Sequence, residues 1–276
     1  MSLTQFLKLE DVRLRFDQDF PVPKIELKGI LLAPPLTDHH ALVGTAFDYL
    51  LRFYLERLNS NATASGWVAE QSVELLRGSK GAHLLGRSIV SGAKKIKAEY
   101  LRNGEVNDRL LECVILLGQL DGVYRAGLID PNLGVADSHD IEDLKNILSI
   151  VKPDAFKAKE TCILNPVFVE SGMVGGADAD FIIDDTLFEI KTTKHLGLRA
   201  EYYHQLVGYY ALFSLGGISF EPRNRINITK LAIYYSRHGV VHYIDVNSLL
   251  RATDFGAFLT WFKARAKQAY PTEEFP

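Results

Sequence analysis

A β-hairpin is predicted by the segment Val174-Gly-Gly-Ala-Asp-Ala-Asp-Phe-Ile-Ile-Asp-Asp-Thr-Leu-Phe-Glu-Ile-Lys-Thr192. Residues 177–183 alternate acidic side chains with small or apolar ones, and residues 186–191 form the return strand. Asp184 and Asp185 suit a two-residue turn between them, because aspartate tolerates turn geometry better than most residues. Such a turn fixes the register of the two strands.

That register brings acidic side chains from both strands together. Asp180 lies opposite Glu189, and Asp178 lies opposite Lys191, on one face of the hairpin. Opposed side chains are about 5 Å apart, and two carboxylates that close repel each other unless a cation lies between them. A few oxygen ligands suit Mg²⁺ or Mn²⁺. Lys191 could orient or help to deprotonate a metal-bound water, or stabilise charge developing on a phosphate. The alternative is a solvated acidic strand pair without a site.

A helix after the hairpin carries a second polar pair, Gln205 and Tyr209, on one face at i,i+4 spacing. The ordered set is Gly175 to Asp178, Glu189-Ile-Lys191 and Gln205 to Tyr209. This set resembles the PD-(D/E)xK nuclease superfamily, specifically its RecB-type branch, over about residues 165–215. The resemblance implies that the hairpin carboxylates hold the metal, that the lysine is catalytic, and that Gln205 and Tyr209 lie beside the site near nucleic acid. Its glycine spacing selects Asp178 as the ligand, whereas cross-strand pairing selects Asp180, and both remain candidates.

An earlier helix, expected over residues 41–58, contains Gly44-Thr-Ala-Phe-Asp48. This run is similar to a first RecB-type motif, Gly-Thr-x-x-His, in which the histidine reaches the metal. Asp48 stands in the place of that histidine and could also bind Mg²⁺, or it could simply face solvent. Lys194 and Arg199, in the loop after the hairpin, are expected near the metal side, where they could hold a phosphate. Glu170 could be a further ligand or a plain strand end.

Composition limits the kinds of partner. The chain has 276 residues, 47% hydrophobic content and a net charge of −3, so any contact with nucleic acid must come from a local basic patch. The most basic stretch runs from Arg77 to Arg102 and is expected either to neutralise phosphates or to form a solvated face. No segment has the roughly 20 apolar residues of a membrane span, so no membrane partner is expected.

Two cysteines, Cys113 and Cys162, lie in apolar runs and are expected to be buried thiols in a reducing compartment, the cytoplasm. Some RecB-type nucleases carry a four-cysteine iron–sulfur cluster, and two cysteines cannot build one within a chain, so no such cluster is expected. The N-terminus lacks the pattern of a signal peptide.

The expected fold is α/β, with a mixed central sheet of about five strands flanked by helices, a restriction-endonuclease-like core and a helical N-terminal half. One domain, 1–276, would contain a helical lobe at 37–150 and a catalytic core at 160–270. Further expectations are irregular structure at 1–36, a loop at 59–66, strands at 162–170, 228–235 and 240–246, one helix at 248–270 and a frayed tail at 271–276.

The function expected from these features is that of a Mg²⁺- or Mn²⁺-dependent deoxyribonuclease. Its partners would be single- or double-stranded DNA and, because no helicase motor is recognisable in the chain, a separate helicase or another replication, repair or defence protein. One alternative is a module on a nuclease-like fold that binds nucleic acid or protein without cutting. The other is an unrelated α/β protein whose hairpin acids only decorate its surface.

Overall fold

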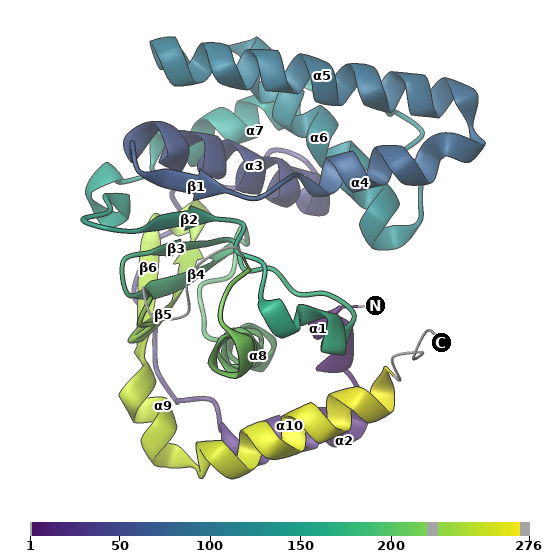
Figure 1. The fold of residues 1–276 in the computed structure, drawn as a ribbon. Helices are drawn as coiled ribbons and strands as arrows, with labels where there is room; N and C mark the ends of the chain where they lie inside the picture. The colour runs from purple at the N-terminus through teal and green to yellow at the C-terminus, as the bar shows by residue number, and fades with distance from the viewer. Residues whose placement is uncertain (1, 220–225, 271–276) are drawn as a thin grey trace.

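The chain is an α/β structure built around one mixed sheet (Figure 1). The computed structural model describes residues 2–219 and 226–270, and within them the sheet has six strands in chain order. The strands are β1 Ala62–Ala64, β2 Cys162–Leu164, β3 Phe181–Ile183, β4 Thr186–Lys191, β5 Lys230–Tyr235 and β6 Val240–Asp245. The pairs β1–β2 and β4–β5 are parallel, and the other three are antiparallel.

The additional strand, β1, lies in the segment expected to be a loop. That expectation is wrong, because Ala62 pairs with Cys162 of β2 although its own neighbours have the composition of a loop. A strand of three residues carries almost no periodicity, so its identity depends on a partner far along the chain.

β3 and β4 form the predicted hairpin. Phe181 lies opposite Phe188, and this pairing confirms the register predicted from the sequence. The first turn residue, Asp184, has a φ of 51°, in the left-handed region that aspartate tolerates. Successive residues of the hairpin point to opposite faces of the sheet, so Phe181 and Phe188 enter one buried cluster and Ile182 and Leu187 the other.

The hairpin acids lie just before the regular ladder. β3 begins at Phe181 and not at residue 177, because the preceding chain pairs irregularly. Asn165 has a φ of 53°, and its N–H donates to the Asp180 carbonyl oxygen at 2.8 Å. Asp178 forms an isolated bridge with Val167. The strand expected over 162–170 correspondingly ends at residue 164.

A helical lobe covers one face of the sheet (Figure 1). Its helices are α3 His40–Leu58, α4 Val68–Leu75, α5 Lys80–Asn103, α6 Asp108–Ala126 and α7 Ser138–Ser149, with the 3₁₀ turns η1 Leu76–Gly78 and η2 Pro153–Phe156. The buried apolar cluster of this lobe includes Phe181 and Phe188 of the sheet, whose rings stack with centroids 4.6 Å apart. These helices occupy the region expected to be helical, 37–150.

Helices from both ends of the chain cover the opposite face. They are α1 Leu3–Phe6, α2 Glu10–Asp19, α8 Ala200–Gly216, α9 Val246–Ala252 and α10 Phe255–Ala269, and two more 3₁₀ turns are η3 Val169–Val174 and η4 Ser236–His238. Figure 1 shows α8 against the sheet, with α2 and α10 outside it. Phe16 of α2 meets Phe258 of α10 edge to face, with centroids 5.2 Å apart. The two ends of the chain thus close one core.

Two further expectations differ from the structure. Residues 1–36 are not irregular throughout, because Val12 and Phe16 give α2 an apolar face that packs into the core. The final helix is interrupted between α9 and α10, where the Asp254 side chain accepts the Ala257 N–H at 3.0 Å and caps α10.

One buried ion pair joins the lobe to the sheet. Arg237, in the turn between β5 and β6, donates to the two carboxylate oxygens of Asp143 on α7, at 2.7 and 2.8 Å. These side chains are 1% and 0% exposed. Arg237 also donates to the Ala33 carbonyl oxygen at 3.1 Å, which fixes the segment before α3. Three distant segments therefore depend on one guanidinium.

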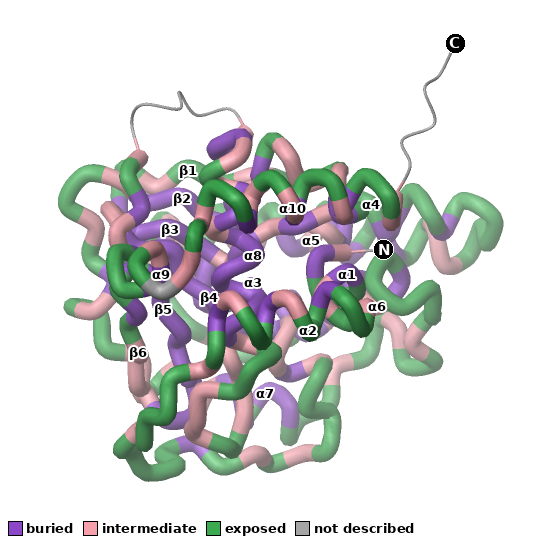
Figure 2. The backbone as a smooth tube through the Cα atoms, turned by 90° about the horizontal axis from the view of Figure 1, so that it is seen from below, coloured by how far each residue is buried: buried purple, intermediate pink, exposed green. Residues whose placement is uncertain are grey.

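Burial follows the layers. Figure 2 shows buried residues along the strands and α8, and exposed residues on the outer turns of the flanking helices. Cys113 and Cys162 are buried free thiols, and burial raises the pKa of each to about 12. In the described ranges no helix is both long and apolar enough to cross a membrane. The tail expected to fray, 271–276, lies outside the described residues.

Candidate active site

A lysine at the end of β4 is held by hydrogen bonds from two elements. Lys191 Nζ donates to Glu189 Oε1 at 2.7 Å and to Gln205 Oε1 at 2.9 Å. Gln205 lies on α8, one turn before Tyr209, and its Nε2 donates to the Tyr209 hydroxyl at 2.8 Å. The structure therefore brings these four sequence-predicted residues into one chain of hydrogen bonds.

The charge state of Lys191 follows from this environment. Burial acts to lower the pKa of Lys191, but the charge and hydrogen bond of Glu189 more than offset it, so the pKa is raised above its ordinary value. The ammonium also lies 4.8 Å from the centroid of the Tyr202 ring, a cation–π contact. Lys191 is therefore a cation at neutral pH, suited to donating a hydrogen bond or balancing negative charge, not to accepting a proton.

Asp180 is the hairpin acid whose pKa responds to the charge of Glu189. Its Oδ2 accepts the Ile190 N–H at 2.5 Å, so the side chain turns towards β4. Burial raises the pKa of Asp180 well above its ordinary value, and the charges of Glu189 and Asp48 raise it further. Burial likewise raises the pKa of Glu189, while Lys191 acts in the opposite direction. A cation would relieve this accumulation of negative charge.

Asp178 has different neighbours. Burial raises its pKa, and the positive charges of Arg125 and Arg52 oppose that rise. The two candidate ligands are thus distinguished by their surroundings, because Asp180 responds to Glu189 whereas Asp178 responds to two arginines.

Asp48 reaches the same group of charges from the helical lobe. It lies on α3, and its negative charge raises the pKa values of Asp178, Asp180 and Glu189. Asp48 Oδ2 pairs with Arg52 at 2.5 Å, one turn further along α3. The segment similar to a metal-binding motif therefore lies where the hairpin acids can interact with it electrostatically.

Two carboxylate oxygens in this group lack hydrogen-bond partners. Asp48 Oδ1 and Glu189 Oε2 are both buried, and neither has a partner among the described residues. Each carboxylate keeps one oxygen bonded to a cation of the chain, Arg52 or Lys191, and leaves the other unsatisfied. A buried unpaired polar atom is costly and calls for a ligand or an ion. Oxygen donors of this kind fit a hard divalent cation such as Mg²⁺ or Mn²⁺.

Two arginines beside the acids were missed by sequence reasoning. Arg52 is 7% exposed and its guanidinium stacks over the Tyr49 ring, 4.6 Å from the centroid. Arg125 lies near the end of α6, where its Nε donates to Asp121 Oδ2 at 3.3 Å. The i,i+4 spacing of Asp48 and Arg52 was a usable signal, whereas nothing in the sequence connects Arg125 with the hairpin.

The remaining predicted residues lie further out. Lys194 and Arg199 are exposed in the segment between β4 and α8. Arg199 lies 5.8 Å from the centroid of the Tyr202 ring, the same ring that Lys191 contacts. Arg199 is thus adjacent to the lysine site without being part of its hydrogen bonds. Glu170 lies in η3, outside the hairpin ladder.

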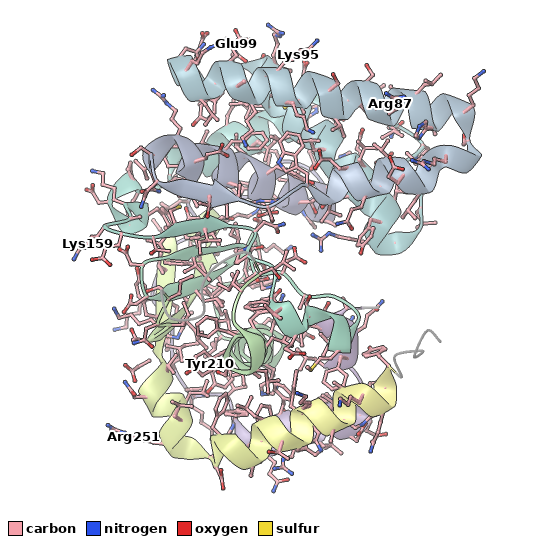
Figure 3. The ribbon with its side chains drawn as sticks, in the orientation of Figure 1. Arg87, Lys95, Glu99, Lys159, Tyr210 and Arg251 are labelled. Atoms are coloured by element: carbon pink, nitrogen blue, oxygen red, sulfur yellow. The ribbon has the colours of Figure 1, made fainter. Side chains whose placement is uncertain are left out.

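The basic stretch, Arg77 to Arg102, forms the end of η1 and most of α5 on the outside of the lobe. Within it, Arg77, Lys94 and Lys97 pair with Glu74, Glu70 and Glu56 respectively. Figure 3 shows Arg87 and Lys95 on α5, away from the sheet and the hairpin. Part of the positive charge is thus balanced within the lobe, and the remainder faces solvent far from the acids.

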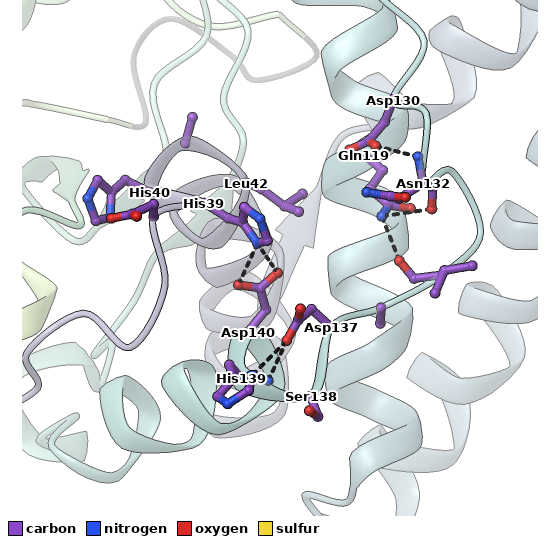
Figure 4. A pocket seen from close by; sticks show the side chains of 14 residues that line it. His39, His40, Leu42, Gln119, Asp130, Asn132, Asp137, Ser138, His139 and Asp140 are labelled. Carbon is purple, nitrogen blue, oxygen red and sulfur yellow. Dashed lines mark hydrogen bonds and ion pairs between the residues drawn. The ribbon is translucent and has the colours of Figure 1, made fainter.

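A cavity of about 710 Å³ lies apart from the hairpin acids, between the start of α3, the start of α7 and the chain before α7 (Figure 4). His39 Nδ1 is 2.9 Å from Asp140 Oδ2 at its edge. The hydrogen bond and charge of Asp140 raise the pKa of His39. This cavity contains none of the hairpin acids, and several of its polar groups bond to one another, as His39 does to Asp140 and His139 to Asp137.

Within the described ranges, no three acidic, histidine or cysteine side chains are arranged as a ready metal-binding cluster. The site acids are instead balanced by Arg52 and Lys191. Comparison with known proteins adds no relative: no family model, no curated protein and no solved structure matches the chain.

Proposed function

We propose that this chain is a metal-dependent nuclease that hydrolyses phosphodiester bonds, with DNA as its substrate. The observation that carries the proposal is a pair of buried, unpartnered oxygens, Asp48 Oδ1 and Glu189 Oε2, the second on a side chain that binds the charged Lys191. These acids come from two layers of the fold, and Asp180 shares their electrostatic environment. The resemblance to RecB-type nucleases in the order of motifs supports the same conclusion.

Asp48, Asp180 and Glu189 would hold a Mg²⁺ or Mn²⁺ ion, with Asp178 beside them. A bound divalent ion would supply polarisation of a phosphate oxygen and a water of lowered pKa. Lys191, held by Glu189 and Gln205, places a fixed positive charge where negative charge develops on the phosphate. Tyr209 holds Gln205 in turn, so α8 acts as a support for the lysine.

The cleavage assay compares wild type with Lys191→Ala on single- and double-stranded DNA, with Mg²⁺ or Mn²⁺. We expect cleavage by wild type and a loss of at least about 100-fold in Lys191→Ala, the scale on which single stabilising donors act. Lys230→Ala is the matched control, because Lys230 lies at the opposite end of the adjacent strand and pairs with Asp185. It should cut as wild type does. No cleavage with either metal, or equal cleavage by Lys191→Ala, would refute the proposal.

Metal binding provides a readout independent of cleavage. Mn²⁺ should raise the melting temperature of wild type, because an ion that binds only the folded state stabilises it by mass action. Glu189→Gln should reduce that shift, and so should Asp48→Asn. An equal Mn²⁺-dependent shift in wild type and both variants would show that the metal binds elsewhere.

The second candidate is a module that binds nucleic acid without cutting it. It is favoured by the internal pairing of Asp48 with Arg52 and of Glu189 with Lys191, which leaves no ready cluster of three ligands in the described residues. DNA binding that survives Lys191→Ala, with no cleavage by wild type, would select this candidate.

A further inference from the structure

A small cleft opens beside the candidate active site. Its volume is about 280 Å³, and it lies between the start of α4, the end of α6 and the chain leading into β3. Asp178 forms part of its lining. In Figure 1 this is the side on which α4 and α6 face η3. The cleft therefore connects solvent with an acid of the hairpin.

Hydrogen bonds between Ser65 and Asn165 form the floor of the cleft. Asn165 Nδ2 donates to Ser65 Oγ at 2.9 Å, and Ser65 Oγ donates to the Asn165 carbonyl oxygen at 2.6 Å. The Asn165 N–H bonds to the Asp180 carbonyl oxygen. One wall contains Gly176, whose φ of 115° favours glycine and whose missing side chain would meet no atom within 4 Å. Hydrogen bonds between two distant segments thus hold the floor, and the wall carries no side chain at Gly176.

Two neighbouring side chains at the end of α6 bear on the chemistry of this cleft, one in its lining and one next to it in the chain. Tyr124 lines the cleft and is 51% exposed, although it is a large aromatic residue. Arg125 follows it and is 54% exposed. In the described part of the chain Arg125 donates one hydrogen bond, from Nε to Asp121, so its terminal nitrogens remain available. Asp121 also accepts a hydrogen bond from the Tyr49 hydroxyl, which in turn accepts the Ala69 N–H at the start of α4, so Arg125 is tied to the element that borders the cleft.

We infer that this cleft binds the unpaired nucleotide next to the phosphate that is cut, an inference that rests on the proposed nuclease function. Tyr124 stacks on the base, and Arg125 contacts a phosphate oxygen. An exposed aromatic ring beside an arginine is the usual means of holding a single strand, because every base offers a π-face. The volume of about 280 Å³ lies just below the range of about 300–1,000 Å³ for ligand pockets, which suits no more than one nucleoside and excludes a double helix. The preferred substrate is therefore single-stranded or has an unpaired end.

The test measures cleavage kinetics on a single-stranded oligonucleotide with Mg²⁺ or Mn²⁺. In Tyr124→Ala we expect KM to rise by about 5- to 150-fold, the range for loss of one stacked base, with kcat changed less than about threefold. Tyr124→Phe keeps the ring and should retain the wild-type KM. Tyr243→Ala is the matched control, because Tyr243 is 48% exposed on β6, and it should behave as wild type.

The arginine is tested in the same way. Arg125→Ala should raise KM and make KM less dependent on salt concentration. Arg125→Lys keeps a positive charge beside the Asp121 carboxylate and should retain most of the affinity for the strand. Arg87→Ala, on the outer face of α5, serves as its control (Figure 3). A substrate that lacks the base at the nucleotide beside the cut should bind wild type as weakly as Tyr124→Ala binds the intact strand, and the two losses should not add.

The outcomes separate this inference from the proposed function. If wild type cuts DNA and Tyr124→Ala keeps the wild-type KM, the cleft assignment is wrong and the nuclease proposal stands. If wild type cuts blunt duplexes as efficiently as single strands, the inferred preference is overturned. If wild type cuts no nucleic acid, both conclusions fall.

Discussion

Breaking the buried pair of Arg237 and Asp143 should strongly destabilise the fold. Asp143→Ala leaves the Arg237 guanidinium, 1% exposed, without its carboxylate. Removing one partner of a buried ion pair typically costs about 3–5 kcal/mol in the free energy of unfolding. For domains approaching this size each kcal/mol lowers the melting temperature by about 2–4 °C, so a fall of about 6–20 °C is expected.

The assay is urea unfolding followed by fluorescence and circular dichroism, with stability taken from coincident transitions. Asp108→Ala is the matched control, because Asp108 also pairs with a cation but is 66% exposed, and its loss should cost less than about 1 kcal/mol. The double variant Asp143→Leu with Arg237→Met should be more stable than Asp143→Ala, since it removes the stranded charge. The reasoning is refuted if Asp143→Ala loses no more than the Asp108 control.

Three other predictions concern the titrating and buried polar groups. The pKa of Asp180 is raised in the folded state above 3.8, so the stability given by its protonation is lost as the pH rises through that raised value. Urea titrations in EDTA should therefore show that Asp180→Asn loses less stability than wild type between pH 4 and pH 7, by up to about 1.4 kcal/mol per pH unit for one proton. Equal pH profiles for the two proteins would contradict this. The raised pKa of His39, followed by NMR, should fall in Asp140→Asn because the charge of its partner is gone, and an unmoved pKa would show that the pair does not form in solution. The pair stabilises the fold below the ordinary histidine pKa of 6.5, and that contribution is lost as the pH rises through the raised pKa. Tyr49→Phe removes a 2.6 Å hydrogen bond to the buried Asp121 and should cost about 1–3 kcal/mol by urea unfolding; a change below about 0.5 kcal/mol would mean that water replaces the hydroxyl.

Local chemistry was enough to predict the hairpin and its surroundings. The alternation of residues 177–183 and the Asp184–Asp185 turn fixed the register, because a one-residue slip would have turned every apolar side chain away from its core. The Gln205 and Tyr209 spacing likewise placed both side chains on the inner face of α8. In both cases the deciding interactions lie within a few residues or one turn.

Features that depend on distant partners were not accessible from the sequence. β1 becomes a strand because β2 accepts it as a neighbour, not because Thr63 and its two alanines favour extended structure. Asn165 adopts a left-handed conformation where β2 ends and β3 begins, and no sequence pattern predicts this conformation. Arg125 affects the pKa of Asp178 only once α6 has packed against α3 and α4. The acids and Lys191, the cation that pairs with Glu189, could be predicted, whereas the contribution of Arg125 could not.

The brevity of β1 has a consequence for how the molecule opens. It is a three-residue edge strand with β2 as its hydrogen-bonded neighbour, and Ser65 directly after it supports the cleft floor. Short edges are the first places where amide hydrogens exchange, at a free-energy cost far below that of complete unfolding. Transient fraying of this edge would widen the cleft mouth while β4 and β5, paired along six residues, stay closed. The entrance of the cleft can then open transiently while the acids and the lysine keep their positions on the paired strands.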